Sequence, residues 1–254
     1  MTKVDNHEAG TICWVDLMTS DAEAARTFYK GLFGWTFLLD DTAPGHYALA
    51  QLGGRPAAGV GPLPPGAPLS PAWSVYFASD ELDATLAKIT AHGGTVMVGP
   101  TDVVEEGRMA VCMDPTGAAF CIWQAKRHVG ARVIDEPNAM CWYEVFTPDA
   151  ARARDFYGSV FGLEARRLVE DGAPELEFYT LHSGTKIVGG IEQTTGAAPH
   201  WRIYFAVADA DVAAARITEL GGSVGVPPFD TPYGRMAVAS DPTGAAFAII
   251  KLAS

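Results

Sequence analysis

The chain opens with a change of hydrophobic period, from the alternation of a strand to the spacing of a helix. Residues 11–19 alternate as a strand does. Ser20 and Glu23 then form an S-x-x-E capping box, which predicts that a helix starts here, and Gly34 predicts where it ends. The apolar positions of this helix recur on one face, at Ala25, Phe28, Leu32 and Phe33.

A second unit of the same kind follows along the chain. Residues 72–78 predict a strand, and a helix is expected over about Asp80–His92, just before a Gly-Gly pair. Segments rich in β-formers then lead to the turn 114–117, with the sequence DPTG, and to a last strand over Ala119–Gln124. The order strand–helix–strands therefore occurs twice before the middle of the chain.

The second half of the chain repeats the first. The run that starts at Cys13 (CWVDLMTSDAEAARTFYKGLFGW) matches the run that starts at Cys141 (CWYEVFTPDAARARDFYGSVFGL). The run PAWSVYFA matches PHWRIYFA, and both halves close with DPTGAAF. Repeats of this length predict two copies of one domain, residues 1–127 and residues 128–254. Each copy reads as two βαβββ modules, so we expect an α+β fold of four modules.

The charge of the chain excludes several kinds of partner. There are 18 Lys and Arg residues against 30 Asp and Glu residues, which gives a net charge of −12. Phosphate backbones and anionic lipid surfaces would repel such a chain. No apolar run approaches the roughly 20 residues that span a bilayer, and the first residues lack the hydrophobic stretch of a secretion signal. We therefore expect neither a nucleic-acid partner nor a membrane partner.

The cysteines indicate a reduced protein. They are Cys13, Cys112, Cys121 and Cys141, each within an apolar run. None forms a C-x-x-C pair, so neither a zinc knuckle nor a thioredoxin-type motif is present. Free cysteines in apolar runs are typical core residues. We expect a cytoplasmic protein.

Two motifs carry a resemblance to a known superfamily. The pattern D-x-x-x-A-x-x-F-Y-x-x-x-F-G occurs over Asp21–Gly34 and over Asp149–Gly162, and each copy ends with D-P-T-G-A-A-F. With these motifs the chain resembles the vicinal oxygen chelate superfamily of glyoxalase I, bleomycin-resistance proteins, fosfomycin-resistance enzymes and extradiol dioxygenases. The paired CW-x-[DE] openings resemble two-domain actinobacterial proteins labelled hydroxylases or culture-filtrate antigens. The resemblance implies that two modules form a U-shaped half-barrel sheet whose concave face holds a metal and the ligand.

The metal ligands that this resemblance implies are missing from the chain. The family places His or Gln on the first strand, His on the fifth strand and Glu on the last strand. In the two copies of this chain, the first-strand position holds Trp14 and Trp142, the fifth-strand position holds Trp73 and Trp201, and the last-strand position holds Cys121 and Ala248. The fourth-strand segments Arg55–Val60 and Lys186–Ile191, where a further ligand belongs, contain no His, Asp or Glu. Indole cannot ligate a metal, and one thiolate makes no site, so we expect neither a metal nor another cofactor.

The histidines do not supply a substitute site. None of the six forms an H-x-x-x-H pair, and only His46 and His182 fall near the third strands, close to the concave face. If the alignment of the ligand positions is one residue out, the lyase or dioxygenase chemistry typical of the family stays open.

Strand alternation predicts which side chains replace the metal. In the first copy the inward set is Trp14, Asp16, Met18, Trp73, Val75, Phe77, Ala119, Cys121 and Trp123. In the second copy it is Trp142, Glu144, Phe146, Trp201, Ile203, Phe205, Ala246, Ala248 and Ile250. Either the tryptophans fill the empty space, or they line a pocket for a flat, apolar or aromatic molecule. Because the second copy has the smaller Ile250 and Ala248 where the first has Trp123 and Cys121, the concave face of the second copy is expected to be roomier and the better candidate for a pocket.

Asp16 and Glu144 are the most informative polar residues. They occupy equivalent positions and are predicted to point into apolar surroundings. Burial there would raise the pKa of each carboxyl, which suits a general acid or base. Alternatively, the carboxylates accept hydrogen bonds from nearby donors and hold the strands together.

Arg108 and Arg235 complete the predicted ligand contacts. Both follow a glycine in the repeated GRM sequence, at a strand entrance. Each arginine either binds an anionic ligand at the rim or pairs with a nearby acid such as Asp114 or Asp241.

Three functions remain open at this point. The first is a metal-free protein that binds a small apolar or aromatic metabolite or drug. The second is a metal-independent isomerase, cyclase or hydrolase that uses Asp16 or Glu144 as acid or base. The third is an interaction protein whose concave faces are filled. One copy alone would leave apolar surface uncovered, so we expect the copies to pack on each other with pseudo-twofold symmetry, in a monomer or a homodimer.

Overall fold

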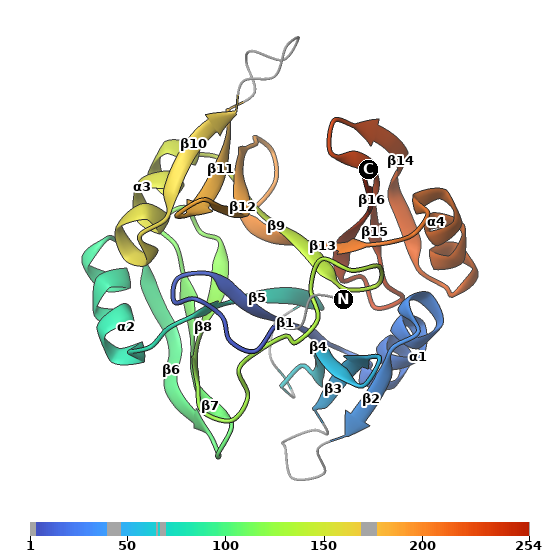
Figure 1. The fold of residues 1–254 in the computed structure, drawn as a ribbon, viewed down its shortest axis with the longest axis horizontal. Coiled ribbons are helices and arrows are strands. Elements are labelled where there is room, and N and C mark those ends of the chain that lie inside the picture. The colour runs from blue at the N-terminus through green and yellow to red at the C-terminus, as the bar shows by residue number, and fades with distance from the viewer. Residues whose placement is uncertain (1–3, 40–46, 65, 67–69, 169–176, 254) are drawn as a thin grey trace.

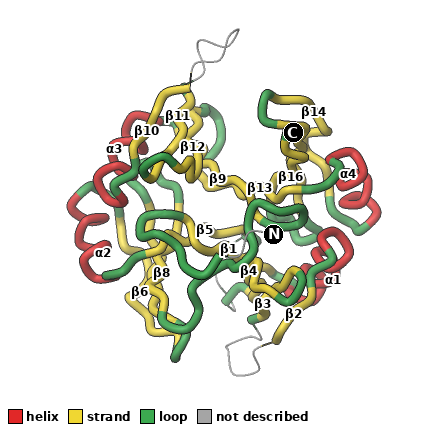
Figure 2. Tube along the Cα trace, in the orientation of Figure 1, coloured by secondary structure: helices red, strands yellow, loops and turns green. Residues whose placement is uncertain are grey.

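The computed structural model describes residues 4–39, 47–64, 66, 70–168 and 177–253. Each copy forms one open eight-stranded mixed sheet with two helices, as Figures 1 and 2 show. The predicted α+β fold of four βαβββ modules is confirmed.

The elements of the two copies follow one another in the same order. The first copy contains β1 (Ile12–Thr19), α1 (Ala22–Phe33), β2 (Thr36–Leu39), β3 (Ala48–Leu52), β4 (Arg55–Pro62), β5 (Ala72–Ala78), α2 (Leu82–Ala91), β6 (Thr95–Val103), β7 (Gly107–Met113) and β8 (Ala119–Ala125). The second copy contains β9 (Met140–Thr147), α3 (Ala150–Phe161), β10 (Glu164–Leu168), β11 (Phe178–Ser183), β12 (Lys186–Gln193), β13 (His200–Ala206), α4 (Ala210–Glu219), β14 (Ser223–Thr231), β15 (Gly234–Ser240) and β16 (Ala246–Leu252).

The first strand of each module lies at the centre of its sheet. The first sheet has the order β2-β3-β4-β1-β5-β8-β7-β6, and the second has the order β10-β11-β12-β9-β13-β16-β15-β14. Strand β1 runs parallel to β4 and antiparallel to β5, and β9 has the same relation to β12 and β13. The two modules of a copy therefore meet at their first strands.

The helix ends lie close to where the sequence predicts them. Asp21, not Ser20, is the N-cap of α1, and its side chain accepts a hydrogen bond from the Ala24 amide at 2.9 Å. Gly34 ends the helix in the left-handed region, at φ 70°.

The two copies pack on each other through their helix-bearing sides. Figure 1 shows α1 beside α4 and α2 beside α3. Aromatic rings fill the space between the sheets: Phe77 of the first copy stacks on Phe161 of the second at 4.3 Å, and Phe33 lies 5.0 Å from Phe205. The expected packing of copy on copy is therefore present within one chain.

Two buried hydrogen bonds join the copies reciprocally. The Tyr29 hydroxyl donates to Asp241 at 3.2 Å, and the Tyr157 hydroxyl donates to Asp114 at 2.8 Å. The other carboxylate oxygen of Asp114 accepts three backbone amides of its own DPTG turn. Each acid therefore fixes its own turn and binds a helix of the other copy, rather than pairing with the predicted arginine.

The prediction of which side chains of β5 and β13 point to the concave face was wrong: the other alternate set points there. The indole of Trp73 donates to Tyr29 at 3.0 Å, and that of Trp201 donates to Tyr157 at 3.1 Å, so both point into the core between the copies. The other members of the same alternation, which face the core with them, are Val75, Phe77, Ile203 and Phe205. These six residues form an apolar stripe that is buried in the core between the copies.

The helices are all short. None in the described part of the chain has the length and the apolar character needed to cross a membrane.

Replacing Tyr157 by Phe tests the bond between the copies. The change leaves one oxygen of Asp114 and the Trp201 indole without their partner, so we expect it to lower the free energy of unfolding by about 2–4 kcal/mol. Tyr179→Phe is the control, because that hydroxyl donates to Glu177 within the same copy, and a loss below about 1 kcal/mol is expected. Urea unfolding measures both, and equal stability of the two variants would contradict the assignment.

Candidate functional site

The side of each sheet away from the helices carries the predicted carboxyl groups. We call the side with Trp14, Asp16, Tyr76, Cys121 and Trp123 the first face. Its counterpart in the second copy, with Trp142, Glu144, Phe146, Arg202 and Tyr204, is the second face. Strand pairing sets Tyr76 opposite Trp14 and Tyr204 opposite Trp142.

Asp16 is buried among hydroxyl groups on the first face. Tyr76 donates to its Oδ2 at 2.7 Å and Tyr47 donates to the same atom at 3.3 Å, while the Trp14 indole donates to Tyr47. Its Oδ1 is buried without a hydrogen-bond partner. Burial raises the pKa of Asp16 to about 6, against the opposing effect of the two tyrosines.

The linker between the copies, residues 126–139, seals the first face. The His128 ring lies edge-on to Trp14 at 4.5 Å and to Trp123 at 5.7 Å, and the Trp123 indole donates to the His128 carbonyl at 2.7 Å. Only 4% of Trp14 and 7% of Trp123 remain exposed. Burial lowers the pKa of His128 to about 4, so the inserted ring is neutral at physiological pH.

The linker is held in place by its backbone. The Ala131 amide donates to the Cys13 carbonyl and the Arg132 amide donates to the Pro56 carbonyl, both at 2.8 Å. Gly130 has φ 111°, and a Cβ there would lie 2.4 Å from the Cys13 oxygen. The space on the first face is therefore filled by tryptophans and by a segment that sequence analysis did not include.

Glu144 occupies the equivalent position on the second face with different neighbours. The Tyr204 hydroxyl donates to its Oε2, and Arg202 and Gly190 are its partners across the strands. Burial raises the pKa of Glu144 to about 7; the Tyr204 hydrogen bond opposes this rise, and the charge of Glu192 adds to it. Near neutral pH this carboxyl can therefore either give or take a proton.

The aromatic surroundings of Glu144 are less enclosed than those of Asp16. Trp142 packs with Tyr204, Ala248, Ile250 and Met236, but it is only half-buried where Trp14 is buried. The equivalent tryptophans of the two copies therefore differ in exposure; that the second copy is the roomier one stays a prediction.

Several side chains of the second face were missed by sequence analysis. Because Trp201 and Ile203 were predicted to point to the concave face, their neighbours Arg202 and Tyr204 were placed on the core side. Glu192 lies one residue beyond Lys186–Ile191, the fourth-strand segment in which a metal ligand was expected. The strand HWRIYFA contains the missing signal: one alternation, His200, Arg202 and Tyr204, is polar or amphipathic, whereas the other is entirely apolar. Tyr76 was misplaced in the same way.

The side chains of both faces do not fit the metal of the family. Within the described residues no three His, Cys, Asp or Glu side chains come together to hold a metal ion. On β5 the side chains that point to the first face are Ser74 and Tyr76, where the family has a histidine ligand. Burial raises the pKa of the Cys121 thiol well above its usual range, which disfavours the thiolate that a metal needs. His182 is buried on β11 with its Nε2 2.8 Å from Thr180. His46 lies outside the described residues.

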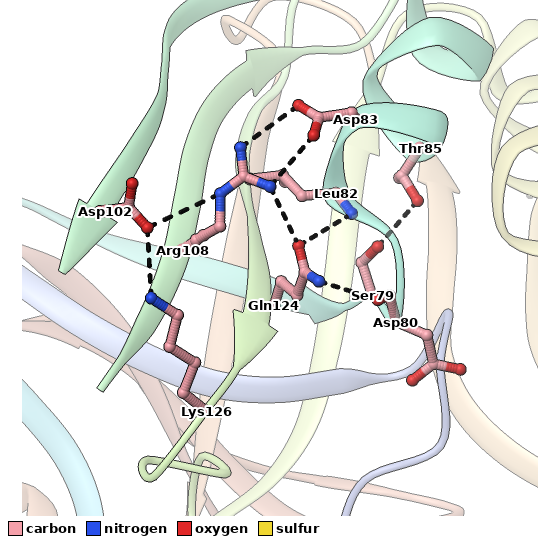
Figure 3. A network of polar contacts seen from close by, with 9 residues as sticks. All are labelled: Ser79, Asp80, Leu82, Asp83, Thr85, Asp102, Arg108, Gln124 and Lys126. Carbon is pink, nitrogen blue, oxygen red and sulfur yellow. Dashed lines mark hydrogen bonds and ion pairs between the residues drawn. The ribbon is translucent and has the colours of Figure 1, made fainter. Parts of the chain in front are cut away.

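Arg108 and Arg235 are engaged in ion pairs with acids near them. Figure 3 shows Arg108 between Asp83 and Asp102, with Gln124 as a further contact. Arg235 pairs with Asp211 at 2.6 Å and with Asp230 at 3.1 Å. Pairing with an acid was one of the two predicted alternatives, but the predicted partners Asp114 and Asp241 were wrong.

Two surface cavities lie away from both faces. One of about 370 Å³ lies between α2 and the end of α3, and its lining includes Ser79, Lys88 and Phe161. The other, of about 570 Å³, is lined by residues of α3 and β10, among them Arg154 and Ala165. Neither is lined by Asp16, Glu144 or a tryptophan, so the two buried carboxyls with raised pKa lie elsewhere.

Comparison with known proteins identifies the family of the fold. The family model of the Glyoxalase/Bleomycin resistance protein/Dioxygenase superfamily matches residues 11–122 and again residues 133–249. CFP32 of Mycobacterium tuberculosis, named as a candidate glyoxylase, is 41% identical over 259 residues, which cover 99% of this chain and 98% of the relative. DnrV of Streptomyces peucetius, named an anthracycline biosynthesis protein, is 38% identical over 260 residues, covering 96% of this chain and 94% of the relative.

Solved structures show the same architecture. A Mn(II)-bound glyoxalase from Novosphingobium aromaticivorans superposes with a TM-score of 0.68 at 15% identity, over 96% of this chain and 82% of that chain. The 2,3-dioxygenase LapB from Pseudomonas sp. KL28 gives 0.68 at 16% identity, over 100% and 94%. At these identities the likeness establishes the fold.

Replacing Glu144 by Gln tests the electrostatics of the second face. Because the folded state raises this pKa from 4.5 to about 7, the protonated form is favoured, and its contribution to stability is lost as pH rises through about 7. We expect the wild type to lose up to about 3 kcal/mol relative to Glu144→Gln between pH 4.5 and pH 8. Urea unfolding at the two pH values measures this, with the exposed Glu219→Gln as control. A difference that does not change with pH would contradict the raised pKa.

Proposed function

The chain belongs to the Glyoxalase/Bleomycin resistance protein/Dioxygenase superfamily, and from that premise we propose that it binds a flat aromatic molecule on its second face. The bound ring lies against Trp142, and its polar group meets Glu144 and Tyr204. No metal takes part in this binding, since the residues of the face do not form a metal site.

The difference between the two copies carries this proposal. On the first face the His128 ring lies edge-on to two tryptophans and closes the space. On the second face Ile250 stands in place of Trp123, and Trp142 keeps part of its surface exposed. A half-buried indole beside a buried carboxyl offers an apolar wall with one polar contact, which is the common composition of small-molecule sites.

The polar pair of Glu144 and Tyr204 suits a ligand with a hydroxyl or carbonyl group. Tyr204 and Trp142 are hydrogen-bond partners of Glu144. Carboxyl oxygens have further lone pairs, so Glu144 accepts from a ligand hydroxyl or, when protonated, donates to a carbonyl. The relative DnrV is named an anthracycline biosynthesis protein. Flat polycyclic compounds with oxygen substituents are therefore the first class to test.

A second function, metal-independent catalysis, is favoured by one observation. The pKa of Glu144 lies near 7, where a carboxyl is most effective as a general acid or base. In this alternative Glu144 moves a proton on the bound molecule, as in an isomerase or cyclase, and Tyr204 holds the carboxyl in position.

Binding is tested with 1-hydroxyanthraquinone by isothermal titration calorimetry. Loss of an aromatic wall removes about 1.5–3 kcal/mol of apolar contact, so Trp142→Leu should weaken binding at least tenfold. Trp14→Leu is the matched control on the sealed face, where we expect lower stability and unchanged affinity. Equal loss of affinity in both variants, or no binding by the wild type to this compound and its hydroxylated analogues, would contradict the proposal.

Catalysis is tested on the compounds that bind. If Glu144 transfers a proton, mass spectrometry and absorbance should detect an isomerised or cyclised product, and Glu144→Gln should slow its formation at least a hundredfold. Asp16→Asn on the sealed face should leave the rate unchanged. Binding without turnover would decide for the binding function alone.

A further inference from the structure

Arg202 is the basic side chain of the second face, and its position is unusual. It lies directly across the strands from Glu144, yet the two do not form an ion pair in the described structure. Instead the guanidinium lies over the Phe146 ring, 4.0 Å from its centroid. The arginine is thus held flat against one end of the face.

The hydrogen-bonding capacity of Arg202 is largely unused. Its Nε is buried and has no partner within the described chain. Its Nη2 lies 3.4 Å from Nε2 of His200, and its side chain is also a hydrogen-bond partner of Tyr204. A buried donor without an acceptor destabilises the folded state, and an acceptor on a bound molecule removes this cost. A guanidinium presents its donors as a fork that matches the two oxygens of a carboxylate.

His200 keeps the arginine in this orientation. Its ring also stacks with Phe146, at 5.1 Å between the ring centroids and with an angle of 10° between the planes. Its Nδ1 lies 2.9 Å from the Ala198 carbonyl, so this nitrogen carries the proton and Nε2 accepts from Arg202. Phe146 and His200 therefore position the fork, and neither neutralises its charge.

The nearby acids leave the arginine available for an anion. Glu144 bonds to Tyr204, and neither Glu144 nor Glu192 forms an ion pair with Arg202 within the described residues. The charge of Arg202 lowers the pKa of both acids, against the larger effect of burial. In a chain with a net charge of −12, an anionic ligand needs such a local cation.

We propose that the guanidinium of Arg202, whose Nε has no partner within the described chain, binds a carboxylate, so that the molecule on the second face is a flat aromatic acid. The ring then lies toward Trp142 and the carboxylate toward Phe146. This inference rests on the proposed function and adds the charge of the ligand to it.

The first copy supports this assignment by contrast. Ser74 lies across from Asp16, where Arg202 lies across from Glu144. The guanidinium is therefore present on the second face, and the equivalent position of the first face, which His128 covers, has no basic side chain.

The test compares two probes that differ only in charge, anthraquinone-2-carboxylate and anthraquinone-2-carboxamide, by calorimetry at pH 7.5. We expect the wild type to bind the carboxylate at least tenfold more tightly than the amide. Arg202→Gln should reduce this preference to less than twofold while retaining affinity for the amide. Arg216→Gln is the control, because it removes the same charge from α4, where the arginine pairs with Glu219.

Arg202→Lys is measured as well, since loss of the stacked guanidinium can disturb the strand. It keeps the charge without the planar fork, and its preference for the carboxylate should be at least threefold smaller than that of the wild type. Equal affinity of the wild type for both probes, or a preference that persists in both variants, overturns the inference and leaves the proposed aromatic site standing. Failure of both probes to bind overturns both.

Discussion

The reciprocal bonds between Tyr29 and Asp241 and between Tyr157 and Asp114 determine how the molecule is built. Each acid completes a turn in its own copy and accepts a hydroxyl from the first helix of the other copy. This arrangement brings the helix-bearing sides together, and the apolar sides of β5 and β13 are then covered. The opposite faces of the two sheets carry Asp16 and Glu144.

The sequence was sufficient for the architecture because the repeat is long and its motifs mark the ends of helices and turns. It also placed Asp16 and Glu144 correctly on equivalent strands, since both belong to the same matched run. It failed for Trp73 and Trp201, because strand alternation separates two sets of side chains without saying which set faces the partner copy. Tryptophan suits both environments: its ring is apolar, and its single N–H needs only one acceptor, here a tyrosine hydroxyl.

The closure of the first face could not be predicted for a different reason. His128 lies in a segment without hydrophobic period, and its contact with Trp14 joins residues far apart in the chain. Such a contact has no local sequence signal. The difference between Trp123 and Ile250 indicated which copy is more open, but not what fills the other. Arg202 and Glu192 were missed because the search followed the ligand positions of the family, whereas the polar residues of the second face lie one position away from them.

The insertion of the linker also affects how this two-copy chain can change during evolution. Connecting segments usually accept insertions and deletions because they cross open surface. Here the backbone of residues 130–132 pairs with β1 and β4, and Gly130 passes within contact distance of Cys13. A residue added or removed between the copies would withdraw His128 from its place between two tryptophans. The length of this linker is therefore constrained by packing in the way that the size of a core side chain is.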